Sequence, residues 1–194
     1  MFITWSLIQS ALELGIIYGI IALALFLTYS MLNVCDLSTD GCYTMGAAAG
    51  AVVALAGHPF LALFAAMGTG VLSGLVNAFL QTKMKVESML AGIIVNTGLY
   101  TVNICIMGKS NLNMNTTETV FSMMKDLTKD TPFESYSKMI VALVFLAIIA
   151  ILLALFLGTR LGLSIRATGN NIAMVKSSSI NPAMTTTVGL CIGG

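Results

Sequence analysis

Four long apolar runs constrain the fold of this chain more than any other feature of its sequence. They lie at residues 11–32, 59–80, 88–108 and 138–158. A helix of about 20 predominantly apolar residues crosses the hydrocarbon core of a bilayer. Only 9% of the 194 residues are charged, whereas a soluble domain carries about 25%. The sequence therefore predicts an all-α integral membrane protein.

Two shorter apolar segments accompany these four runs. Residues 41–57 are rich in Ala and Gly, and a last run begins near Pro182 and reaches Gly194. We therefore predict a single transmembrane domain over residues 1–194, a polytopic helical bundle with about five full or partial spans and an incomplete sixth.

Lysine and arginine residues in the loops predict the orientation, because cytoplasmic loops carry the excess of positive charge. Lys83 and Lys85 mark one such loop, and segment 159–181 carries further basic residues. Two crossings separate these loops, so they fall on the same side. In loop 109–137 acidic residues balance the lysines, and we predict that this loop is external.

Small residues four positions apart predict close packing between helices. The pairs are Gly15 with Gly19, Gly46 with Gly50, and Gly70 with Gly74. Three asparagines also lie within the apolar runs: Asn77, Asn96 and Asn103. We expect these asparagines to form hydrogen bonds between helices; a role in a transport path is the alternative.

The stretch NVCDLSTDGCYTMGAAAG, residues 33–50, interrupts the apolar pattern. Asp36 and Asp40 adjoin apolar runs, where a charge is costly unless it faces a polar interior or a partner. Ser38 and Thr39, like both aspartates, are good N-cap residues. We predict that the chain breaks here and restarts as a half-helix, which requires a protein or wet environment at membrane depth. A plain cytoplasmic turn with a capped helix is the alternative.

The polar stretch GLSIRATGNNIAMVKSSSINPAM, residues 162–184, is the second interruption. We predict that Gly169 breaks the chain and that Asn170 or Asn171 caps a short helix ending near Ser179. Pro182 suits the first turn of the next span. A short basic helix between two spans is suited to dock a partner; a loop that binds anionic lipid is the alternative.

Other motifs predict no chemistry in this chain. The tripeptide GKS at 108–110 lacks the earlier glycine of a phosphate-binding loop, because Asn103 stands there. Cysteines form no CxxC pair, and His58 has no metal-ligand neighbour at the required spacing. We therefore predict no catalytic residue, metal or cofactor in this chain.

Both polar stretches resemble one protein family, the permease subunits of ABC importers of the branched-chain amino acid and ribose type. The second stretch matches that family's cytoplasmic loop at Gly162, Arg166, Ala167, Gly169, Asn170, Ala173, Ile180 and Asn181. The first, DLSTDGCYTMGA, resembles the Asp-Leu-Ser motif after the first long helix and is most similar to the tryptophan- and tyrosine-type uptake branch. Ser179 replaces a common glycine and Cys42 a common serine. The chain is also shorter than usual members, so we expect a C-terminal truncation.

The resemblance implies a multi-pass protein of the bacterial plasma (inner) membrane, not an enzyme. Two permease subunits, as a homodimer, would form the path for a small solute such as an amino acid. An external solute-binding protein would deliver the solute, and separate ATPase subunits would bind ATP and Mg and hydrolyse the nucleotide. Membrane lipid would surround the permease, and no nucleic acid partner is expected.

The resemblance also implies roles for particular residues. Residues 170–179 would be the coupling helix, and the residues that couple to the ATPase would be Arg166, Ala167, Gly169, Asn170, Asn171, Ala173 and Lys176. The broken helix beside the translocation path would comprise Asp36, Ser38, Thr39, Asp40 and Gly41. Two alternatives remain: an ion-coupled secondary transporter in which Asp36 and Asp40 bind the coupling ion, and an inactive permease fragment.

Overall fold

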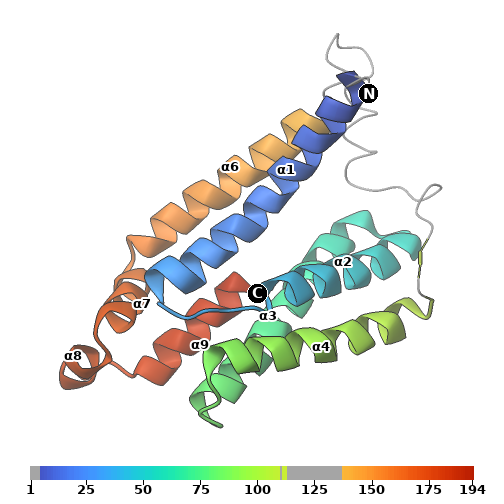
Figure 1. The fold of residues 1–194 in the computed structure, drawn as a ribbon. Coiled ribbons are helices and arrows are strands. Elements are labelled where there is room, and N and C mark those ends of the chain that lie inside the picture. The colour runs from blue at the N-terminus through green and yellow to red at the C-terminus, as the bar shows by residue number, and fades with distance from the viewer. Residues whose placement is uncertain (1–4, 110, 113–136) are drawn as a thin grey trace.

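The computed structural model describes residues 5–109, 111–112 and 137–194 (Figure 1). Most of the predicted external loop, 109–137, lies outside these residues. The described chain contains helices and no strand, which confirms the predicted all-α class. In chain order the helices are α1 (Trp5–Leu25), η1 (Phe26–Met31), α2 (Thr39–Leu55), α3 (Pro59–Thr82), α4 (Ser88–Met107), α6 (Ser137–Leu157), α7 (Arg160–Asn170), α8 (Ile172–Ser177) and α9 (Pro182–Gly193).

Four of these helical segments are long and apolar enough to cross a membrane. They are Leu7–Met31, Pro59–Thr82, Ser88–Met107 and Lys138–Leu157. These segments confirm the four predicted runs, and α1 merges into the π-helical η1 to complete the first. The two shorter predicted segments are also helical: α2 has 17 residues and α9 has 12.

The long helices fall into two groups. The first group is α1 and α6, the second group is α2, α3, α4 and α9, and η1 and α7 connect the two groups. Helices α1 and α6 lie side by side and run in the same direction (Figure 1). Helix α2 packs against α3 and α4, and α3 also packs against α9. At the end of α6, α7 turns back toward η1 and α9.

Close contacts in the second group use the predicted small residues. A methyl group on Gly46 would lie 3.5 Å from the Ala66 carbonyl oxygen, and one on Gly70 would lie 2.7 Å from the Gly194 carbonyl oxygen. Helices α2 and α9 therefore approach α3 at a distance that larger side chains would prevent. In α1 the pattern predicts packing less well, because a methyl group on Gly15 would have no neighbour within 4 Å among the described residues.

The predicted basic loops lie at one end of the molecule. The turn between α3 and α4, which holds Lys83 and Lys85, and the helices α7 and α8 lie at the same end of the bundle (Figure 1). Lys83 also lines a cavity with Thr187 of α9. We call this the basic end, defined by Lys83, Lys85, Arg160, Arg166 and Lys176. Its arrangement agrees with the prediction that both loops face the same side.

Candidate functional site

The predicted break after the first span is present. Helix η1 ends at Met31, Asn33 has a left-handed backbone with φ of 55°, and α2 begins at Thr39. Asparagine adopts this conformation more readily than most residues because its short polar side chain can hydrogen-bond locally. Residues 32–38, which we call the break segment, therefore join two helices without being helical themselves.

The break segment lies within the bundle. A methyl group on Gly92 would lie 2.7 Å from the Leu37 backbone nitrogen, so glycine permits this close approach. Gly92 lies about one turn after the start of α4, and Asn77, the α3 residue that is hydrogen-bonded to Asp36, lies more than one turn before the end of α3. The segment thus lies slightly inside the basic end, with Leu32, Asp36 and Ser38 buried and with Asn33 and Leu37 exposed.

Asp36 is the centre of a buried hydrogen-bond network. Its Oδ1 accepts hydrogen bonds from the Ser38 backbone N–H at 2.8 Å, the Ser38 hydroxyl at 2.6 Å and the Asn77 side-chain amide at 2.8 Å. Asp36 is 6% exposed, and the other two residues are fully buried. A buried carboxylate is costly unless donors stabilise it. Three donors to one oxygen explain how Asp36 is tolerated here.

Asn77 extends this network along α3. Its Nδ2 also donates to Ser38 Oγ at 2.9 Å, and its Oδ1 accepts from Gln81 Nε2 at 3.0 Å. The expected hydrogen-bonding role of Asn77 between segments is confirmed. Asn103 likewise donates to Thr44 Oγ1 at 3.1 Å between α4 and α2, while its Oδ1 has no partner among the described residues.

The predicted helix caps are partly wrong. Ser38 occupies the N-cap position of α2, but its side chain makes no capping hydrogen bond. Its hydroxyl contacts Asp36 and Asn77 instead. The Thr39 hydroxyl donates to the Asp36 carbonyl oxygen at 3.4 Å. It therefore bonds to the backbone of the break segment and does not cap α2.

The break places its two carboxylates in different surroundings. Asp36 is buried, whereas Asp40 is exposed in the first turn of α2. Gly41 faces α4, where a methyl group would collide with Asn96. Of the five predicted residues, Asp36, Ser38 and Thr39 therefore form a common site, Gly41 permits close helix packing, and Asp40 points away from the network.

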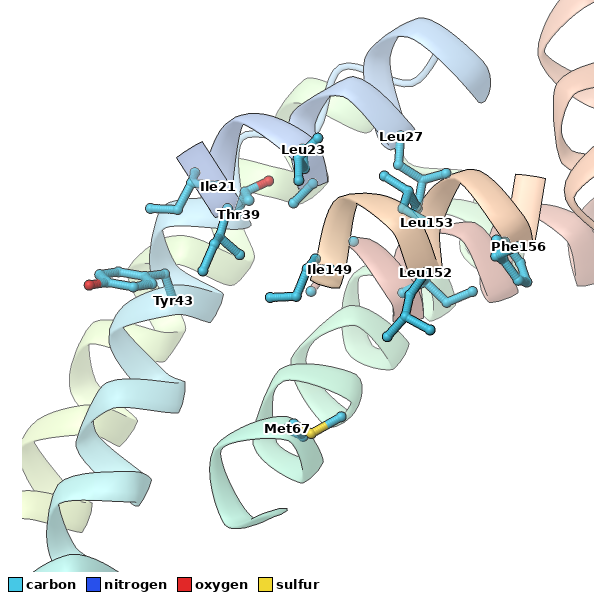
Figure 2. Close-up of a pocket in the computed structure, with 15 residues that line it drawn as sticks. Ile21, Leu23, Leu27, Thr39, Tyr43, Met67, Ile149, Leu152, Leu153 and Phe156 are labelled. Carbon is cyan, nitrogen blue, oxygen red and sulfur yellow. The ribbon is translucent and has the colours of Figure 1, made fainter. Parts of the chain in front are cut away.

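An apolar cavity of about 470 Å³ adjoins the start of α2 (Figure 2). Side chains from α1, η1, α3, α6 and α9 line it together with Thr39 and Tyr43 of α2. In this lining the polar side-chain oxygens are the hydroxyl groups of Thr39 and Tyr43. The other lining residues are aliphatic residues, glycines, Phe156 and Met67. Among the described residues, the cavity lining thus provides apolar contacts and no charged side chain.

The second polar stretch forms two short helices where we predicted one. Asn171 has an extended backbone between α7 and α8, and its side chain accepts hydrogen bonds from the N–H groups of Ala173 at 3.0 Å and Met174 at 3.1 Å. Asn171 is therefore the cap of α8, and Asn170 is the last residue of α7. Helix α8 (Ile172–Ser177) is therefore shorter than the coupling helix predicted at residues 170–179.

The prediction that Gly169 breaks the chain is wrong. Gly169 lies inside α7, where a methyl group would collide with the Met31 carbonyl oxygen and the Leu32 backbone. The low helix propensity of glycine is outweighed here by a close crossing between α7 and the end of the first span. Pro182 does begin α9 as predicted, with the Asn181 side chain accepting from the Ala183 N–H.

The residues that the resemblance assigns to ATPase coupling are mainly at the surface. Those exposed are Arg166, Asn170, Asn171, Ala173 and Lys176, and those half-buried are Ala167 and Gly169. In α8, Val175 is 2% exposed, while Ile172 and Met174 are 55% and 65% exposed. One face of α8 is anchored in the protein, and the other presents two apolar side chains beside Lys176.

The departure from the family pattern at Ser179 has a structural consequence. Ser179 has φ of 60° just after α8. This left-handed backbone is favourable for glycine and strained for serine, which explains why glycine suits this position.

One group of buried residues was missed by sequence reasoning. Leu32, Ala78, Ile165 and Leu190 pack together, each at most 3% exposed. They come from the break segment, α3, α7 and α9, and we call this cluster the junction. The regular spacing of Gly162, Ile165 and Thr168, all buried, was a signal for an inward face of α7.

Comparison with known proteins identifies the family. The profile described as the branched-chain amino acid transport system / permease component matches residues 7–194. The chain belongs to this permease family. No solved structure matches the chain significantly.

Two relatives of this permease show how much of the chain is shared. It is 37% identical over 186 residues to the tyrosine transport system permease protein of Clostridioides difficile strain R20291, covering 95% of this chain and 59% of the relative. It is 30% identical over 167 residues to an uncharacterized protein of Rickettsia prowazekii strain Madrid E, covering 86% of this chain and 56% of the relative. The chain thus spans less than two thirds of the length of either relative. Family membership and apolar spans together make it a multi-pass membrane protein.

Proposed function

We propose that this chain is the permease subunit, or a portion of the permease subunit, of an ATP-driven importer of a small solute in a bacterial inner membrane. The solute class that its relatives favour is an amino acid, and tyrosine is the first to test. A separate ATPase subunit would bind ATP and Mg, an external binding protein would deliver the solute, and a second permease subunit would complete the path.

The observation that carries this proposal is the presentation of α8. Val175 holds the helix against the protein, while Ile172, Met174 and Lys176 project outward. Asn171 stabilises the first turn through two hydrogen bonds. A short, capped helix with exposed apolar side chains and a cation can insert into a groove on a partner.

The charge distribution supports the same surface. Arg166 on α7 and Lys176 on α8 are both exposed at the basic end. An arginine can form a bidentate contact with a carboxylate. The proposal places this end in the cytoplasm, where positive loops are favoured, and where an ATPase would meet it.

Transport in proteoliposomes tests the proposal. The chain is reconstituted with ATPase subunits of amino acid import systems and a tyrosine-binding protein, and uptake of radiolabelled tyrosine is measured with ATP inside or outside the vesicles. We expect uptake only when ATP reaches the ATPase. Tyrosine uptake driven by a proton or sodium gradient without any ATPase would contradict the proposal and favour the ion-coupled alternative.

A further inference from the structure

We infer that Asp36 is a positioning residue that holds the break segment as a mechanical link between the surface helices α7 and α8 and the spans α2, α3 and α4. The mechanical link is formed by contacts within this chain. A role of this link in transport rests on the function proposed above.

The break segment is attached to α7 by close backbone contact. Gly169 of α7 faces the Met31 carbonyl oxygen and the Leu32 backbone so closely that no larger residue fits. Ile165, one turn earlier on α7, is fully buried and packs in the junction with Leu32. A shift of α7 therefore cannot occur without moving the start of the break segment.

The other end of the segment is attached to the spans. Asp36 accepts a hydrogen bond from Asn77 of α3 at 2.8 Å, and Leu37 lies against Gly92 of α4. Ser38, bound to both Asp36 and Asn77, directly precedes α2. Three spans are therefore positioned by residues 36–38.

Asp36 fixes the conformation between these two attachments. The segment is not helical, so it has no repeating hydrogen bonds of its own. The Leu32 N–H bonds to the Leu27 carbonyl oxygen at 3.1 Å, and the Val34 N–H bonds to the Thr28 carbonyl oxygen at 3.0 Å. In addition, Asp36 Oδ1 accepts three hydrogen bonds from Ser38 and Asn77. Close-packed, fully bonded surroundings move between discrete arrangements and do not deform gradually. Loss of the network would free residues 36–38 from α3, so a shift of α7 would no longer pass through the break segment to the start of α2.

Helix α8 connects this link to the surface. Helix α8 follows α7 after the single extended residue Asn171, and its own residue Val175 is buried against the protein. The Thr168 hydroxyl lies 2.8 Å from that of Thr185 on α9, so α7 is also tied to the next span. A partner that displaces α8 would thus move α7 and, through the break segment, the start of α2.

Amide hydrogen exchange of the full chain in lipid nanodiscs tests the link without any partner. The variant Asn77→Ala removes the donor to Asp36 from α3. We expect exchange in α7 and α8 to accelerate about tenfold, because loss of a buried partner frees a segment that the network had held. The conservative variant Asp36→Asn keeps an Oδ1 acceptor for all three donors and should leave exchange near the wild-type rate.

Asn103→Ala is the matched control. It removes another hydrogen bond between α4 and α2, but Asn103 takes no part in the junction or the Asp36 network. We expect α7 and α8 to exchange at the wild-type rate in this variant. Equal exchange of these helices in Asn77→Ala and Asn103→Ala would overturn the inference. Should Asn77→Ala fail to fold, Asp36→Ala, which removes the acceptor Oδ1, replaces it, and unchanged exchange in α7 and α8 would again refute the link.

A transport readout separates this role from mere stability. In the reconstituted importer, Asp36→Ala should retain ATPase binding but carry fewer tyrosine molecules per ATP hydrolysed. An unchanged ratio would contradict the role in transport. If wild type binds no ATPase, the proposed function fails, whereas the exchange experiment still decides whether the link exists.

Discussion

Ser179 shows how one residue can limit local stability. Its φ of 60° brings the side chain of an L-residue close to its own backbone, at a cost of about 1 kcal/mol. We predict that Ser179→Gly raises the free energy of unfolding by up to about 1 kcal/mol, measured by denaturant unfolding in detergent.

The neighbouring Ser178 provides the control for this prediction. It has φ of −86°, and its hydroxyl donates to the Met174 carbonyl oxygen at 3.1 Å. Ser178→Gly should bring no gain because no strain is relieved there. Equal stabilisation by both substitutions would show that the backbone of Ser179 is not the cause.

At the residue scale, the sequence predicted that the two aspartates need a polar environment, but it did not predict which of them is buried. A carboxylate beside an apolar run must find partners, so a special environment for Asp36 or Asp40 was predictable. Which of them faces inward was not, because residues 33–38 are not helical and no helical period relates their side chains. Only Asn77 of α3, distant in sequence, shows that Asp36 is the buried one.

Helix α7 depends on one glycine for its position. A methyl group on Gly169 would collide with the Met31 carbonyl oxygen and the Leu32 backbone, neither of which can rotate away. We predict that Gly169→Ala lowers the free energy of unfolding by about 2 kcal/mol, measured by thermal or denaturant unfolding, and increases amide exchange in α7.

Gly98→Ala on α4 is the comparison for this substitution. In the described part of the chain, nothing lies within 4 Å of a methyl group there, and alanine favours a helix over glycine by about 0.5–1 kcal/mol. Gly98→Ala should therefore be neutral or stabilising. A loss of stability in Gly98→Ala as large as that in Gly169→Ala would contradict the packing account.

At the element scale, the long spans were predictable and the short helices were only partly so. Four apolar runs were sufficient to locate the four long spans. In α7, Gly169 suggested a helix end, but the tertiary contact of Gly169 keeps it inside the helix. Asn171, one of the two predicted cap residues, does cap α8. Glycine has two uses, in breaks and in close approach, and the sequence alone does not distinguish them.

The whole molecule has one end rich in basic residues, which predicts its orientation. We expect a cysteine replacing Lys83 or Ser177 to react with a membrane-impermeant maleimide only from the cytoplasmic side, and a cysteine replacing His58 only from outside. Labelling is measured on intact cells and on inverted vesicles, in a variant in which serine replaces the native cysteines. Labelling of positions 83 and 177 from opposite sides would contradict the arrangement in Figure 1.

At the scale of the molecule, the family was predictable from two motifs, but the junction was not. Leu32, Ala78, Ile165 and Leu190 come from four separate elements, and each alone is an ordinary apolar residue in an apolar chain. Only the fold places the two motifs against one another. It thereby joins the surface helices to the buried break, a relation that neither motif contains.

Capture of an ATPase by the exposed surface of α7 and α8 tests the central claim most directly. The chain is co-expressed with ATPase subunits of amino acid import systems, and a pull-down compares wild type with the double variant Arg166→Glu and Lys176→Glu. Both side chains are exposed, so the variant should fold normally, insert into the membrane and lose at least about tenfold in capture. Equal capture by the wild type and the double variant, or no capture by a folded, inserted wild-type chain, would contradict the account.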